Sequence, residues 1–307
     1  MTLKGKDVVS ITDFTREEVD QILRTARNLE PLAREGSDLL RGKVLATLFF
    51  ESSTRTRLSF ETAMHRLGGS TIGFAEATAS SVSKGETLAD TVRVVENYAD
   101  VIVIRHPLEG SSRLAADYAN IPVINAGSGS EEHPTQAFLD LYTMWKELGR
   151  IEELNVALVG DLKYGRTIHS LAYLLSKYNV NLFFVSHPSL RIRDEVAGDL
   201  KKSGIKFQEL SDIKEVVPKV DVLYMTRIQK ERFPDLAEYE KVKGFYSITT
   251  ELLRDAKSNM IILHPLPRVG EIDVAVDATP HARYFKQVFY GVVTRMAILA
   301  LILGAIE

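Results

Sequence analysis

Apolar, strand-like runs alternate with helical patterns along almost the whole chain of 307 residues. The first clear run, residues 44–50, is followed by apolar residues at helical spacing, and a second series of the same kind starts at residues 155–160. This alternation is typical of parallel sheets covered by helices. We therefore predict an α/β fold with two domains, each a mostly parallel sheet flanked by helices.

Two helices frame this division. A helix is predicted over residues 134–148, with proline at its first position and glycine just after its end, and we place the domain boundary on it. The last helix, predicted over residues 284–304, is strongly apolar but is interrupted by Thr294 and Arg295. The apolar run within it, residues 288–303, falls short of the roughly 20 residues that a bilayer span needs, so we expect a buried helix.

Composition excludes several classes of protein. A net charge of −3 provides no basic surplus for binding nucleic acid or an anionic membrane. The sequence contains no cysteine, which rules out disulfides, a thiol nucleophile and thiolate metal sites, and fits a cytoplasmic protein. The N-terminus has no apolar signal core.

The segment 52–57, Ser-Ser-Thr-Arg-Thr-Arg, lies between the first strand-like run and a predicted helix. A helix N-terminus carries unpaired N–H groups and a partial positive charge, so two arginines beside it conflict unless an anion lies among them. Hydroxyls, N–H groups and guanidinium groups together suit a phosphate. The alternative is a serine N-cap followed by solvated arginines.

Arginines also follow other predicted strands. The complete set after strands is Arg55, Arg57, Arg105, Arg166, Arg227 and Arg268. Ligands of open parallel sheets collect beyond the carboxyl ends of the strands, so six arginines there predict a cleft between two sheets that holds a phosphate and one or two carboxylates. For any one arginine, a surface ion pair is the alternative.

His133 precedes the helix predicted at residue 134. A neutral imidazole there can donate a hydrogen bond to an oxygen that gains charge in a transition state, although an N-cap histidine without a chemical role is equally compatible. The sequence has no nucleophile elbow, no dinucleotide fingerprint and no histidine pair at metal-ligand spacing. We expect neither cofactor nor metal, and predict group transfer by positioning and electrostatics.

Taken together, these motifs resemble the aspartate/ornithine carbamoyltransferase family. Residues 53–57 match its carbamoyl phosphate motif, residues 133–136 its second signature, and residues 226–232 and 264–268 its aspartate-type stretches. Ornithine-type relatives carry a Cys-Leu-Pro near the last strand, whereas this chain has no cysteine. The resemblance implies transfer of the carbamoyl group of carbamoyl phosphate to the amino group of L-aspartate, a step of pyrimidine biosynthesis.

The resemblance also implies roles for individual residues. The implied catalytic residues are Arg55, Thr56, Lys84, Arg105 and His133. The implied carbamoyl phosphate ligands are Ser53, Thr54, Arg55, Thr56, Ser80, Lys84, Arg105, His133, Gln136 and the carbonyls of Leu266 and Pro267. The implied aspartate ligands are Lys84, Arg166, Arg227 and Gln229. The departing phosphate takes the proton of the attacking amine, which explains the missing general base.

The resemblance further implies an organisation of the chain and its assembly. Residues 1–134 with 285–307 would bind carbamoyl phosphate, residues 135–150 would connect, and residues 151–284 would bind aspartate, with the C-terminal helix packing back on the first domain. Ser80 and Lys84 would reach a neighbouring subunit's site, so a homotrimer is expected, with regulatory chains as an open possibility. Two alternatives remain: a carbamoyltransferase for another amino acid such as ornithine, and a non-catalytic phosphate-binding assembly subunit.

Overall fold

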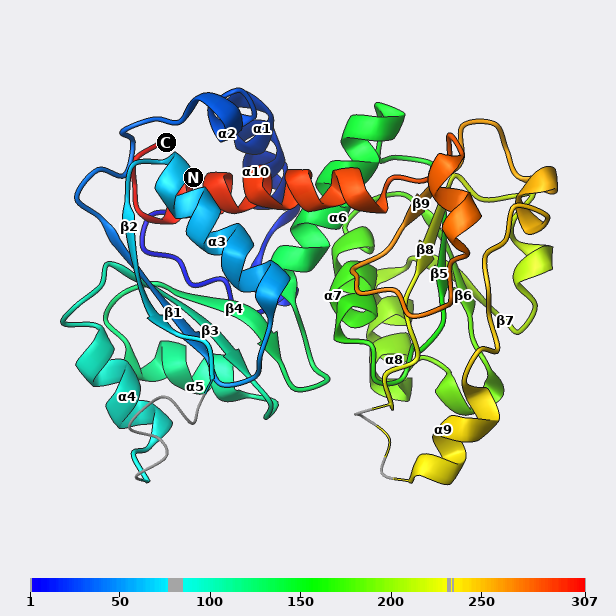
Figure 1. Ribbon diagram of the computed structural model, residues 1–307, viewed down its shortest axis with the longest axis horizontal. Coiled ribbons are helices and arrows are strands. Elements are labelled where there is room, and N and C mark those ends of the chain that lie inside the picture. The colour runs from blue at the N-terminus through cyan, green and yellow to red at the C-terminus, as the bar shows by residue number, and fades with distance from the viewer. Residues whose placement is uncertain (1, 77–84, 231–232, 234, 307) are drawn as a thin grey trace. The chain divides into compact units, whose positions relative to one another are not determined.

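The chain folds into two compact units in the computed structural model, which describes residues 2–76, 85–230, 233 and 235–306. Unit 1 comprises Met1–Tyr142 and Phe289–Glu307, and unit 2 comprises Thr143–Val288. The chain passes from one unit to the other inside two helices, α6 (Pro134–Leu148) and α10 (Tyr284–Ile302) (Figure 1). Both helices lie where the sequence predicts them.

Unit 1 is built on a four-stranded parallel sheet with the order β2-β1-β3-β4. Its strands are β1 (Val44–Phe49), β2 (Ser70–Phe74), β3 (Val101–His106) and β4 (Val123–Ser128). Its other helices are α1 (Arg16–Leu29), α2 (Leu32–Glu35), α3 (Thr54–Arg66), α4 (Leu88–Val95) and α5 (Ser111–Tyr118). Alternate residues of β1 and β3, such as Ala46 and Ile104, pack against Val92 of α4 and Ala115 of α5. Figure 1 shows α1, α3 and the end of α10 on the opposite face.

Unit 2 repeats this plan with a five-stranded parallel sheet in the order β7-β6-β5-β8-β9. Its strands are β5 (Asn155–Val159), β6 (Asn181–Val185), β7 (Lys206–Leu210), β8 (Val222–Met225) and β9 (Ile261–Leu263). Its own helices are α7 (Arg166–Leu175), α8 (Asp194–Ser203) and α9 (Leu236–Val242). The prediction of two parallel sheets flanked by helices is therefore confirmed.

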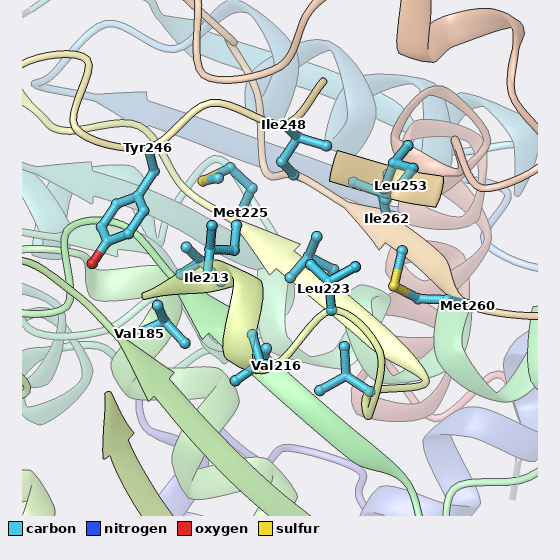
Figure 2. Close-up of a cluster of buried hydrophobic side chains, with 14 of the residues drawn as sticks. Val185, Ile213, Val216, Leu223, Met225, Tyr246, Ile248, Leu253, Met260 and Ile262 are labelled. Carbon is cyan, nitrogen blue, oxygen red and sulfur yellow. The ribbon is translucent and has the colours of Figure 1, made fainter. Parts of the chain in front are cut away.

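Short 3-10 helices complete the core of unit 2. They are η4 (Pro188–Leu190), η5 (Ile213–Glu215), η7 (Leu252–Asp255) and η8 (Val274–Ala278), and unit 1 has η1 (Ile11–Asp13). Figure 2 shows one apolar face of the sheet, where Leu223 and Ile262 meet Ile213 and Leu253 of these turns. These turns thus bury apolar side chains against the sheet, η5 from the connection between β7 and β8 and η7 from the connection between β8 and β9.

The last helix, α10, is a core helix. Within the described part of the chain it is the one helix whose length and composition would allow a bilayer span, yet 72% of its apolar window is buried inside the protein. Its C-terminal half belongs to unit 1, where Met296 and Leu299 are fully buried. The prediction of a buried terminal helix that packs on the first domain is confirmed.

Candidate active site

In both sheets, the order in which the chain adds strands reverses at the first strand of the unit. In unit 1 the chain goes from β1 to β2 on one side and then crosses to β3 on the other, and in unit 2 it goes from β5 to β6 and β7 before crossing to β8. In open α/β sheets, ligands bind beyond the carboxyl ends of the strands at this reversal. The candidate site residues of unit 1 lie at the carboxyl ends of β1 and β3 and after β4, and those of unit 2 follow β5, β8 and β9.

The start of α3 supplies the phosphate-type donors of unit 1. Ser53 is the N-cap residue in extended conformation, and its hydroxyl accepts no capping bond from the backbone that the structure describes. Thr54 begins the helix, Arg55 is exposed and Thr56 is buried. One helical turn thus brings together hydroxyls, N–H groups and a guanidinium, as the sequence predicts.

Arg57, in the same segment, has a carboxylate partner of its own. Its Nε donates to Glu61 Oε1 at 2.7 Å, one turn further along α3. The positive charge of Arg57 is therefore balanced within the helix, and it needs no bound anion to be stable. We expected that both arginines of residues 52–57 need a bound anion, and for Arg57 this expectation is wrong.

Arg105 is the penultimate residue of β3 and lies directly opposite Phe49 of β1. Its guanidinium donates to Glu51 Oε1 at 2.5 Å and to the Ala126 carbonyl at 3.3 Å, and its side chain is 13% exposed. Glu51 is a residue that the sequence analysis missed, although it directly follows β1 at the same edge. Two fixed acceptors hold the guanidinium plane beside the start of α3.

His133 lies at the start of α6 and is buried. Its backbone carbonyl accepts the N–H groups of Gln136 and Ala137, so it is positioned by the helix that it opens. The side chain of Gln136 is also buried, and its Nε2 donates to Asp140 Oδ1 at 2.8 Å. The His133 and Gln136 side chains therefore belong to the first turn of one helix in unit 1.

In unit 2, Asp161 links the two arginine-bearing segments. It follows β5, it is fully buried, and it accepts N–H groups from Tyr164, from Lys163 and from Gln229 beyond β8. Burial raises the pKa of Asp161 to about 6, and these backbone bonds oppose the shift. The carboxyl group thus holds the segment before Arg166 against the segment that carries Arg227.

Gly160 lets the same two strand ends approach closely. Its φ is +118°, and a Cβ atom there would lie 2.2 Å from the Thr226 carbonyl oxygen. Arg166 begins α7 and is 6% exposed, whereas Arg227 is half-buried. Unit 2 therefore presents two guanidinium groups from adjacent strand ends.

The segment after β9 is braced by His264. Its Nδ1 accepts the Leu266 N–H at 2.8 Å, so its Nε2 carries the proton and donates to Glu271 Oε1 at 2.7 Å. Burial lowers the pKa of His264, Glu271 opposes this, and Arg227 lowers it further. The positive charge of Arg227 thus disfavours protonation of His264, whose Nδ1 holds the Leu266 N–H.

Arg268 serves the fold of unit 2. It forms a bidentate ion pair with Asp277, with Nη2 to Oδ2 at 2.6 Å, and its guanidinium lies 5.4 Å from the ring centre of Tyr284. Of the six arginines at strand ends, Arg57, Arg105 and Arg268 each pair with a carboxylate of their own unit. The resemblance assigns four of the six to ligands, namely Arg55 and Arg105 in unit 1 and Arg166 and Arg227 in unit 2.

Ser80 and Lys84 lie outside the described residues. Among the residues that are described, no group of three or more histidines or carboxylates is arranged to hold a metal ion.

Comparison with known proteins identifies the family. Residues 6–146 match the aspartate/ornithine carbamoyltransferase carbamoyl-P binding domain, and residues 152–302 match the Asp/Orn binding domain of the same family. The chain belongs to the aspartate/ornithine carbamoyltransferase family. The resemblance stated from the motifs is confirmed.

Curated relatives match over their whole length. The aspartate carbamoyltransferase catalytic subunit of Methanothrix thermoacetophila is 59% identical over 98% of this chain and 99% of its own. That of Thermococcus kodakarensis is 57% identical over 100% and 99%.

Solved structures share the fold. The catalytic subunit of M. jannaschii aspartate transcarbamoylase is 54% identical, with a TM-score of 0.88 over 96% of this chain and 97% of that one. The Trypanosoma cruzi enzyme in complex with carbamoyl phosphate is 41% identical, with a TM-score of 0.94 over 98% and 97%. A further T. cruzi structure, with a TM-score of 0.93 over 98% of both chains at 41% identity, contains carbamoyl phosphate and aspartate.

Proposed function

We propose that this chain is the catalytic subunit of an aspartate carbamoyltransferase. It transfers the carbamoyl group of carbamoyl phosphate to the α-amino group of L-aspartate, which yields N-carbamoyl-L-aspartate and phosphate in pyrimidine biosynthesis. The observation that carries this proposal is the match at 59% identity over 98% of the chain to a catalytic subunit of that name. The substrates in the T. cruzi complexes support the same reaction.

Unit 1 supplies the groups that suit carbamoyl phosphate. The start of α3, with Ser53, Thr54, Arg55 and Thr56, binds the phosphate through hydroxyls, N–H groups and one guanidinium. Thr56, Arg105 and His133 donate to the carbamoyl oxygen, and Gln136 accepts from the carbamoyl nitrogen. Residues 1–134 with 285–307 form the corresponding domain, and residues 135–150 connect it to the next.

Unit 2 supplies the groups that suit aspartate. Arg166 and Arg227 each grip one carboxylate with a planar fork, and Gln229 supports them. The carbonyls of Leu266 and Pro267 orient the carbamoyl and attacking amino groups, because His264 fixes this segment. Residues 151–284 form the aspartate-binding domain.

The reaction proceeds by addition and elimination. The lone pair of the aspartate nitrogen forms a bond to the carbamoyl carbon, and the carbonyl oxygen becomes an oxyanion. Arg105, Thr56 and His133 stabilise that charge, since fixed donors in a site of low polarity act most strongly where charge develops. The C–O bond to phosphate then breaks, and the leaving phosphate takes the proton of the former amine.

The assembly is a homotrimer in this proposal. Ser80 and Lys84 complete the site of a neighbouring subunit, where Lys84 contacts both substrates. Regulatory chains can join such trimers, and the lack of cysteine suits a cytoplasmic enzyme.

The test is an assay of the purified chain with carbamoyl phosphate and either L-aspartate or L-ornithine. Carbamoyl-aspartate and phosphate in equal amounts are expected from aspartate, and no citrulline from ornithine. Citrulline would instead identify ornithine as the acceptor. Binding of carbamoyl phosphate without any product would identify a non-catalytic phosphate-binding subunit.

A further inference from the structure

A buried carboxyl group and a buried guanidinium lie behind Gln136 in unit 1. Asp140 stands one turn further along α6, is fully buried, and accepts Gln136 Nε2 at 2.8 Å. Arg295 of α10 is 3% exposed, and its charge interacts favourably with Asp140. Two charged side chains without solvent contact are costly to bury, so their presence behind a proposed ligand calls for an explanation.

The arginine occupies a site shaped for it. Its Nη1 donates to Ser59 Oγ at 2.9 Å, and its guanidinium lies 4.9 Å from the ring centre of Phe60. Gly291 makes the room, since a Cβ atom there would lie 2.8 Å from Arg295 Nη1. Burial lowers the pKa of Arg295 to about 10, which still leaves it cationic at neutral pH.

The charge on Asp140 determines which end of the Gln136 amide can face it. An ionised carboxylate only accepts hydrogen bonds, so the nitrogen of Gln136 must point toward Asp140 and its oxygen must point away. A neutral carboxyl could donate, and the amide could then turn around. A nearby guanidinium favours the ionised form of a carboxyl group.

We propose that Asp140 and Arg295 are positioning residues that make the enzyme select the NH₂ group of the carbamoyl substrate, by holding Gln136 with its oxygen toward that group. This inference rests on the proposed function, in which Gln136 meets the carbamoyl nitrogen. A site with a fixed acceptor binds a ligand that carries a donor and discriminates against one that lacks it. Acetyl phosphate is the matched probe, because it has the same phosphate and carbonyl with a methyl group in place of NH₂.

The experiment compares dissociation constants of freshly prepared carbamoyl phosphate and of acetyl phosphate. In Asp140→Asn, which preserves size and removes the charge, we expect carbamoyl phosphate to bind about tenfold more weakly and acetyl phosphate to bind within about twofold of wild type. Gln136→Ala should show the same change in the ratio of the two dissociation constants, that of acetyl phosphate divided by that of carbamoyl phosphate. The double variant should show no further change, because the two residues act as one unit.

Two variants at Arg295 test the pair independently. Arg295→Met leaves Asp140 buried without this counter-charge, so the ratio should fall as in Asp140→Asn. Arg295→Lys keeps the charge and should retain a wild-type ratio, even where thermal stability drops because the bond to Ser59 is lost. If Asp140→Asn does not fold, this second pair of variants decides.

Some results would overturn the inference. An equal loss of affinity for both phosphates would indicate a merely structural role, and an unchanged ratio in Asp140→Asn or Arg295→Met would exclude selection through Gln136. Failure of the proposed function is recognised separately, since wild type would then not bind carbamoyl phosphate or would not form carbamoyl-aspartate.

Discussion

The two units use one architectural device at the start of their sheets. In unit 1, Asp100 accepts the Val44 N–H at 2.8 Å and Lys43 Nζ at 2.8 Å, which joins the beginnings of β3 and β1. In unit 2, Asp221 accepts the Asn155 N–H and Lys257 Nζ, both at 2.8 Å, and joins the beginnings of β8 and β5. In both units an aspartate before one strand thus accepts the first N–H of its neighbour, while the lysine precedes β1 in unit 1 and β9 in unit 2.

At the opposite edge the units differ. Unit 1 presents a helix N-terminus with hydroxyls, which can surround the oxygens of a tetrahedral phosphate. Unit 2 presents Arg166 and Arg227 from adjacent strand ends, whose planar forks match carboxylates. In the proposed function, the strand order determines where a ligand binds, whereas the first residues after each strand determine which ligand it is.

The largest effect is expected from Arg105→Ala in unit 1. Loss of a fixed donor to the developing oxyanion should lower kcat/KM by about 10³. Steady-state kinetics measure the loss, and Arg113→Ala on α5, an exposed arginine paired with Asp13, is the matched control with activity near wild type. A small loss of kcat/KM in Arg105→Ala would contradict a role of unit 1 in stabilising the oxyanion.

Arg227→Lys should act on the other substrate. The variant keeps the charge and loses the fork, so KM for aspartate should rise about 10²-fold, or roughly 3 kcal/mol. Carbamoyl phosphate affinity, measured by calorimetry, should stay unchanged. Arg191→Lys, at an exposed ion pair with Glu209, is the control. Equal weakening of both substrates would contradict the division of ligands between the units.

The matched variants Asp221→Asn and Asp100→Asn test the shared device. The Asp221 side chain is 5% exposed and that of Asp100 is 31% exposed, so removal of the charge should cost more in unit 2. We expect losses in the free energy of unfolding of about 2 kcal/mol for Asp221→Asn and about 1 kcal/mol for Asp100→Asn. Urea unfolding measures both, and the reverse order would break the comparison.

The contribution of Asp221 should depend on pH. Burial alone would raise the pKa of Asp221, but its bonds from Lys257 and Asn155 outweigh burial and lower it. A carboxyl group with a lowered pKa stabilises the fold above its unfolded value, about 3.9, and this stabilisation disappears as the pH falls through the folded value. The difference between wild type and Asp221→Asn should therefore be constant near pH 7 and shrink below about pH 4.

The smallest effect is expected from Arg57→Gln. Because Arg57 forms a partly exposed ion pair with Glu61, its loss should change stability by less than about 0.5 kcal/mol. Activity should stay within about threefold of wild type, in contrast to Arg55→Gln. If Arg57→Gln lost as much activity as Arg55→Gln, Arg57 would be a phosphate ligand after all.

The sequence predicted the features that depend on local pattern. Alternating strands and helices, the proline that opens α6 and the hydroxyl-rich start of α3 are all readable from neighbouring residues. The arginines after strands also led to a prediction of which edge of each sheet binds a ligand, since the carboxyl end of a parallel strand is a property of chain direction alone.

Pairings between distant residues escaped prediction. Asp277 pairs with Arg268, and Glu51 holds the guanidinium of Arg105. The bond between Glu51 and Arg105 could not be predicted from neighbouring residues, because the two lie at the ends of different strands. Asp161 escaped prediction as well, because its role depends on backbone groups beyond β8. Such carboxylates directly after strands are a signal that can be sought in other chains.

The discontinuity of unit 1 has a consequence during synthesis. Its core requires Phe289–Glu307, and the Gly5 N–H donates to the Ile302 carbonyl near the other end of the chain. Unit 2 is one uninterrupted segment and can fold as soon as it leaves the ribosome, whereas unit 1 must wait for the final residues. The half of the molecule that is translated first is therefore completed last, and chaperones have their longest opportunity to bind its unfinished apolar surface.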